Sequence, residues 1–210
     1  MLHDVLLITE KHTKAAQQIV EHINMMEGGK IVIAIGGESG SGKSELGHEV
    51  ARLLKMQNTP AKMMHIDNYY KTSPHERNPW RKAHGAENIG HIEYNWNSIN
   101  RNLQEFLDDA VVAVMPSVDL LTDQEDFITT SFLGFRYLVV EGLYAINIEA
   151  DLRILIDLTY HETKKAQLLR GKETMDEWRQ QVLEREHQVV QSLRPLANLI
   201  VTPEFDVKLI

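Results

Sequence analysis

Residues 37 to 44 have types and a spacing that suit the binding of a phosphate chain. They read Gly-Glu-Ser-Gly-Ser-Gly-Lys-Ser and match the pattern G-x-x-x-x-G-K-[ST] at every fixed position. The glycines let the backbone wrap with its N–H groups pointing at an anion, and a helix N-terminus adds partial positive charge there. Lys43 can reach the β- and γ-phosphates of a nucleoside triphosphate, and the Ser44 hydroxyl can ligate Mg²⁺. The predicted nucleotide contacts are Gly37, Glu38, Ser39, Gly40, Ser41, Gly42, Lys43, Ser44 and the next residue, Glu45.

The segments on either side of this loop are those that the motif needs. Residues 30–35 form a short, apolar and β-branched run, which predicts a buried strand. Residues 45–55 carry Leu46, Val50 and Leu53 at helical spacing, which predicts a helix. Strand, glycine loop and helix in this order argue against a glycine-rich turn that contains a lysine by chance.

Two further acids come at the ends of predicted strands. Asp67 follows the strand 63–66, and Glu141 ends the strand 136–141. Open α/β sheets bind ligands at the carboxyl ends of their strands. Asp67 could accept the proton of a substrate hydroxyl or help to hold Mg²⁺, and the alternative is a turn-forming aspartate. Glu141 is in the place of the acid that steers Mg²⁺ or its water in nucleotide-binding proteins.

Residues 71–96 are polar and aromatic and show no clean period, so we expect a substrate loop or small lobe over the sheet edge. The segment is locally basic through Arg77, Arg81, Lys82 and His84, which suits an anionic ligand.

The rest of the chain alternates between the two kinds of element. Helices are expected at 9–27, 97–108, from 163 to 170 and at 177–193, strands at 110–115, 153–158 and 205–210, and a solvated acidic loop within 120–135. This order predicts a single α/β domain over 1–210, in three layers, with a mostly parallel sheet between helices.

Composition narrows the class of protein. The 210 residues carry a net charge of −8, which argues against a nucleic-acid-binding surface. There are no cysteines, so disulfides and thiolate sites are excluded, and a cytoplasmic protein is expected. No apolar run approaches the ~20 residues of a membrane helix, and the start lacks the features of a signal peptide.

Several segments together resemble the uridine kinase and phosphoribulokinase group of P-loop kinases, from about residue 30 to about residue 208. The matching elements are the phosphate loop, Asp67-Asn-Tyr-Tyr70, His91, Pro116 with Asp119, and Glu141-Gly142. The resemblance implies ATP and Mg²⁺ as cosubstrates, Asp67 as the base on the acceptor hydroxyl, and Tyr70 as a contact to the acceptor.

The chain departs from the uridine kinase pattern in the nucleoside pocket. Gly90, Val118 and Asp123 stand where uridine kinases have an aspartate on the ribose, a tyrosine and a histidine on the pyrimidine. His91 matches the family, and Glu93 is close enough in sequence to take over the ribose role.

The lid region, 170–180, departs as well. Arg170 matches a family arginine, but the positions of the family's other lid arginines are occupied here by Gln167, Met175 and Glu177. Lys172 could substitute only with a shift in register. A basic segment that closes over phosphates and a solvated helix face are equally supported here.

The main hypothesis is a small-molecule kinase that moves the γ-phosphoryl of a nucleoside triphosphate to an alcohol, which is expected to be anionic. Lys43, Asp67 and Arg170 would be catalytic, Lys172 would contact the nucleotide, and Ser44 with Glu141 would hold Mg²⁺. Tyr70, His91 and Glu93 would contact the acceptor. The alternative is a non-catalytic ATP- or GTP-binding module, since losing lid arginines can remove ~10³–10⁵ of the rate.

Overall fold

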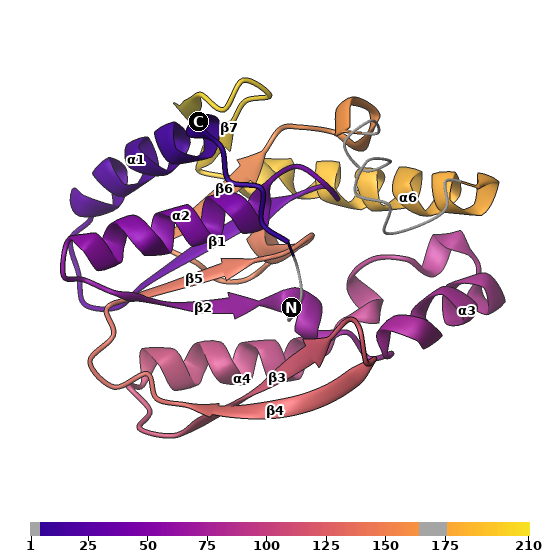
Figure 1. Ribbon diagram of the computed structural model, residues 1–210, viewed down its shortest axis with the longest axis horizontal. Coiled ribbons are helices and arrows are strands. Elements are labelled where there is room, and N and C mark those ends of the chain that lie inside the picture. The colour runs from indigo at the N-terminus through magenta and orange to yellow at the C-terminus, as the bar shows by residue number, and fades with distance from the viewer. Residues whose placement is uncertain (1–4, 164–175) are drawn as a thin grey trace.

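A computed structural model describes residues 5–163 and 176–210 of the chain. Its centre is a six-stranded sheet in the order β2-β5-β1-β6-β7-β8 (Figure 1). The strands are β1 (Ile31–Gly37), β2 (Ala61–His65), β5 (Tyr137–Glu141), β6 (Leu152–Ile156), β7 (Leu199–Val201) and β8 (Val207–Leu209). All neighbours run parallel except β8, which is antiparallel to β7.

Side chains of the central strands alternate between two hydrophobic cores. On β1, Ile31, Ile33 and Ile35 face one core, and Val32 and Ala34 face the other. Successive strand residues point to opposite faces, and both faces of this sheet are covered, so every residue of β1 is buried.

Helices cover both faces. The helices α1 (Glu10–Asn24) and α2 (Lys43–Met56) pack on one side, and α4 (Trp96–Leu107) and α6 (Glu177–Leu193) pack on the other. The predicted three-layer α/β architecture with a mostly parallel sheet is therefore confirmed. Among the described residues, no helix combines the length and apolarity needed to cross a membrane.

The segment 71–96 is more ordered than its sequence predicts. It holds the helix α3 (Pro74–His84) and short 3-10 turns at Ala86–Asn88 and His91–Glu93. Arg81 is the one residue of α3 that is buried, so this helix has no apolar stripe by which a period could be recognised.

The expected third strand and the acidic loop after it are also different. Pro116 does not end a strand: β3 (Ala113–Asp119) runs through it and pairs with β4 (Gln124–Thr130) in a separate antiparallel hairpin. Most of β4 is exposed on both faces, which removes the alternation that marks a strand. A proline is tolerated because a hairpin strand has a free edge where no N–H is needed.

The strands β7 and β8, near the C-terminus, complete the sheet, and α1 packs close to them. The three-residue strand β7 was not expected, and the last strand is shorter than expected and antiparallel. The helix α1 packs on α2 and also contacts β8. Lys14 of α1 pairs with Asp206, just before β8, at 2.9 Å.

Candidate active site

The phosphate loop connects β1 to α2, so the N-terminus of α2 begins at Lys43 and faces the loop. Lys43 and Ser44 are half-buried. The Ser41 hydroxyl is buried and has no hydrogen-bond partner among the described residues. An unpaired hydroxyl beside a helix N-terminus fits a phosphate ligand. Glu45 is buried and accepts a bond from the Leu7 N–H at 3.3 Å, so it contacts the N-terminal segment.

Ser44 and Glu141 meet as the cation hypothesis requires. The Ser44 hydroxyl donates to Glu141 Oε2 at 3.1 Å, and His65 Nδ1 lies 2.6 Å from Glu141 Oε1. Burial alone would raise the pKa of Glu141, but the hydrogen bond and charge of His65, with Lys43 and Ser44, lower it to about 2. A fully ionised carboxylate beside a hydroxyl is a ligand set that Mg²⁺ accepts when phosphates and water complete it.

The described residues contain no cluster of three or more histidine, cysteine or acidic side chains that could bind a metal by themselves. His65 was missed as a site residue. The pairing of β2 with β5 places His65 beside Glu141. His65 could have been chosen only from this strand order, which the sequence does not give.

Asp67 lies next to this pair. It follows β2 in a 3-10 turn (Ile66–Tyr69), and the Tyr94 hydroxyl donates to its Oδ1 at 3.1 Å. A Cβ at Gly142 would lie 2.3 Å from Ile66 Cγ1 and 3.2 Å from Asp67 Oδ1, so the absence of a side chain after Glu141 leaves room for the turn that carries Asp67. Burial raises the pKa of Asp67, Lys43 opposes the rise, and Glu141 adds to it. Two neighbouring carboxylates are thus shifted in opposite directions, as in sites where an acid and a base have separate roles.

Aromatic rings form one side of the site around Asp67. The ring of Tyr70 is 4.1 Å from that of Tyr94, and the ring of Tyr144 is 5.5 Å from Tyr94 and 5.1 Å from His91. The Arg77 guanidinium lies 3.3 Å from the centre of the Tyr70 ring. Tyr70 and His91, the predicted acceptor contacts, therefore lie in one cluster, which also contains Tyr94 and Tyr144.

Glu93 is engaged elsewhere. Arg81 donates to its two carboxylate oxygens at 2.6 and 3.0 Å, and the Gly90 N–H donates to Oε2 at 3.0 Å. Arg81 also donates to Glu186 Oε1 at 3.1 Å. These contacts argue against Glu93 as a ribose ligand, and they take Arg81 out of the basic surface that the sequence suggested.

The three altered nucleoside positions have structural reasons. Gly90 has φ +138°, and a Cβ there would lie 3.2 Å from Val189 Cγ2, so an aspartate would be both strained and crowded. Val118 is buried, and Asp123 pairs with His75.

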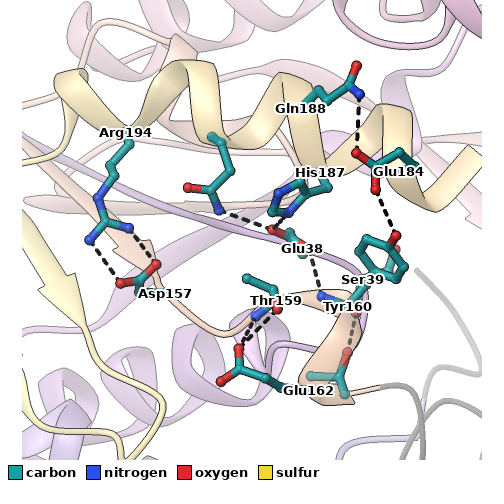
Figure 2. A network of polar contacts seen from close by, with 12 residues as sticks. Glu38, Ser39, Asp157, Thr159, Tyr160, Glu162, Glu184, His187, Gln188 and Arg194 are labelled. Carbon is teal, nitrogen blue, oxygen red and sulfur yellow. Dashed lines mark hydrogen bonds and ion pairs between the residues drawn. The ribbon is translucent and has the colours of Figure 1, made fainter.

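Glu38 connects the phosphate loop to α6 and to the backbone at Tyr160 (Figure 2). Its Oε1 accepts from His187 Nδ1 at 2.7 Å and from Gln191 at 3.1 Å, and its Oε2 accepts from the Tyr160 N–H at 2.7 Å. The Thr163 hydroxyl donates to the Ser39 carbonyl at 3.2 Å. The carboxylate of Glu38 therefore binds to α6 and Tyr160, and it holds the phosphate loop against α6. Arg170 and Lys172 lie outside the described residues.

The fold and the loop together define an α/β nucleotide-binding protein of the P-loop class. The family model of the phosphoribulokinase / uridine kinase family matches residues 32–168, more than half of the chain, and the chain belongs to this family. No curated protein matches it.

Solved structures agree on the fold at low sequence identity. A "possible uridine kinase" from Bacillus stearothermophilus has a TM-score of 0.62 and 15% identity over 89% of this chain and 97% of its own. The phosphoribulokinase of Rhodobacter spheroides has a TM-score of 0.61 and 14% identity over 82% of this chain and 70% of its own. A D-glycerate 3-kinase from Cryptococcus neoformans has a TM-score of 0.58 and 11% identity over 99% of this chain and 100% of its own.

Proposed function

We propose that the protein is an ATP-dependent small-molecule kinase that transfers the γ-phosphoryl group of a nucleoside triphosphate to an alcohol. The observation that carries the proposal is Asp67, a half-buried carboxylate of raised pKa beside the Ser44–Glu141 pair. A protein that only binds nucleotide has no need of a second carboxylate, because its negative charge opposes phosphate binding.

Each side chain then has a defined task. Lys43 and the loop amides bind the phosphates, and Ser44 with Glu141 would hold Mg²⁺, with His65 fixing the orientation of Glu141. When bound, Mg·ATP supplies the phosphoryl group and neutralises part of its charge. Asp67 would orient the acceptor hydroxyl and take its proton as the bond between the acceptor oxygen and the γ-phosphorus forms and the bond to the departing nucleoside diphosphate breaks. Arg170 and Lys172 are proposed to offset charge in the transition state.

The alternative is the non-catalytic binding module. The two functions differ in product, since slow ATP hydrolysis can occur in either. A panel of alcohols incubated with Mg·ATP and the full chain should yield at least one phosphorylated acceptor, detected by mass and by ³¹P resonance. Tight Mg·ATP binding with no phosphorylated product across the panel would favour the binding module.

Uridine and cytidine are expected to be poor acceptors. Gly90, Val118 and Asp123 offer no partners for the ribose hydroxyls and the base edge, and Glu93 is held by Arg81. A missing polar partner can cost orders of magnitude in kcat/KM because buried groups stay unpaired. Uridine titrated in the presence of a non-hydrolysable ATP analogue should show no micromolar binding. Micromolar affinity would restore uridine as the acceptor.

Replacement of Glu38 tests the link between the loop and α6. Glu38→Ala leaves Tyr160 N–H, His187 and Gln191 without their acceptor, and we expect about a tenfold rise in the Kd for Mg·ATP, the equivalent of one ordinary hydrogen bond. Glu38→Gln should lose less because it keeps one acceptor oxygen. Glu184→Ala is the matched control, since Glu184 bonds Tyr160 in the same network without touching the loop. A Kd that is equal in Glu38→Ala and wild type would show that the loop does not depend on this link.

A further inference from the structure

Buried polar atoms without partners are concentrated in the candidate active site. In the described part of the chain there are five such side-chain atoms, and one of them is Ser41 Oγ in the phosphate loop. The other four belong to Asn68, Arg77, Tyr144 and Glu186. Folded proteins pair almost all of their buried polar atoms, so an unpaired group needs an explanation such as a ligand or water.

Three of these residues, Asn68, Arg77 and Tyr144, are next to Asp67 in sequence or contact the aromatic rings beside it. Asn68 follows it in sequence, and Arg77 lies over the ring of Tyr70. Tyr144 contacts the rings of Tyr94 and His91 and comes from the 3-10 turn after β5 (Ala145–Asn147), where it is the N-cap. The hydroxyl of Tyr94 in turn bonds Asp67.

Glu186 comes from α6 and lies near Tyr144, whose pKa its charge affects. Its Oε1 is held by Arg81, which also grips Glu93, so one cation serves two buried carboxylates. Its Oε2 is left unpaired, although the side chain is only 6% exposed. Burial and the charge of Glu186 raise the pKa of Tyr144, so the phenol stays protonated and can donate a hydrogen bond.

The unpaired atoms define what a ligand must offer. The carboxylate oxygen of Glu186 and the amide oxygen of Asn68 need donors, and Arg77 Nε needs an acceptor. The Tyr144 hydroxyl can use either. Hydroxyl groups satisfy all four, because each donates and accepts. An anionic group could pair with Arg77, but beside Glu186 it would be repelled by the unpaired carboxylate oxygen, and the Arg81 guanidinium there already binds two carboxylates.

We propose that Tyr144 and Glu186 are specificity residues that bind hydroxyl groups of a neutral, polyhydroxylated acceptor at the end away from the hydroxyl that Asp67 activates. This inference rests on the proposed kinase function and replaces the anionic acceptor that the basic segment 77–84 suggested. Arg77 and Asn68 would complete the polar surroundings of the same molecule.

A pair of tyrosine variants separates this role from a structural one. Tyr144→Phe removes an unpaired hydroxyl, so it should keep or raise Tm while lowering kcat/KM for the acceptor about tenfold. Tyr69→Phe is the control: its hydroxyl donates to Asn102 at 2.8 Å, inside the core, so it should lower Tm and keep kcat/KM. The probes are neutral sugars and sugar alcohols of three to six carbons, with the matching sugar acids and sugar phosphates, each with Mg·ATP.

Glu186→Gln gives a second measurement. The amide oxygen can still accept from Arg81, while the NH₂ group replaces the unpaired oxygen with a donor. We expect about a hundredfold lower kcat/KM for the neutral acceptor and an unchanged Kd for Mg·ATP. Turnover of sugar acids or phosphates alone, or an unchanged kcat/KM in Tyr144→Phe, would overturn this inference and leave the kinase intact. Failure of the wild type to phosphorylate any alcohol would overturn the kinase proposal and this inference with it.

Discussion

Asp67→Asn is expected to lower kcat by about 10²–10⁴-fold, the range that general base catalysis supplies, while the Kd for Mg·ATP stays close to that of the wild type. Asparagine keeps the size and polarity of the side chain and can still accept the hydrogen bond from Tyr94, but it cannot take a proton. The loss should therefore fall on kcat and leave nucleotide binding intact. Single-turnover kinetics with a saturating acceptor, together with calorimetric titration of Mg·ATP, would measure both quantities.

The pH profile provides an independent readout of the same residue. A base must be ionised to act, so kcat should fall as the pH falls through the pKa of Asp67. Burial raises that pKa, so the acid limb should lie above the ordinary aspartate value of about 3.9. Glu141, with its pKa near 2, stays ionised throughout this window and does not produce the limb. The limb should be absent from the residual activity of Asp67→Asn.

Asp126→Asn is a suitable control because Asp126 is exposed on β4 of the hairpin. It changes the net charge of the protein by the same amount without touching the site. Equal kcat in Asp67→Asn and Asp126→Asn would reduce Asp67 to a turn-forming residue, which the sequence alone also allowed.

The elements that position the phosphate loop could be predicted because they obey local rules. The run 31–35 is apolar on both faces, and the helix after the loop has a regular apolar stripe, so each carries its own signal. The order of strands, the hairpin and α3 carry no such signal. β4 is exposed on both faces, and α3 buries only Arg81, whose partners lie 12 and 105 residues away.

The same distinction applies to the site. Ser44 could be chosen because it is a fixed position of the phosphate-loop motif, and Asp67 and Glu141 because they follow or end a recognisable strand. The roles of His65 and Glu93 depend on pairing between distant segments: His65 lies beside Glu141 only through the β2–β5 register, and Glu93 is occupied only because Arg81 reaches it from α3. Sequence proximity to His91 suggested the opposite for Glu93. Partners of buried charges are decided by tertiary packing, which a local pattern does not contain.

Lys43→Ala is expected to lower Mg·ATP affinity about a hundredfold and to leave the fold intact. A charged hydrogen bond contributes ~1.5–3 kcal/mol, and the loss of one or more such bonds to the phosphates gives this magnitude. Lys43 is half-buried and lies outside both hydrophobic cores, so its truncation removes no core packing. The loss of its charge should also raise the pKa values of Asp67 and Glu141, which it now lowers.

Thermal unfolding with and without Mg·ATP measures this loss directly. At a ligand concentration 100 times the wild-type Kd, binding stabilises the wild type by about 2.7 kcal/mol, and a hundredfold weaker variant by only about 0.4 kcal/mol. Lys55→Ala, in the last turn of the same helix and exposed, should keep the full stabilisation. If Lys43→Ala kept it as well, the triphosphate would bind elsewhere, because a loop that holds phosphates through α2 cannot lose its one lysine at the helix start without losing affinity.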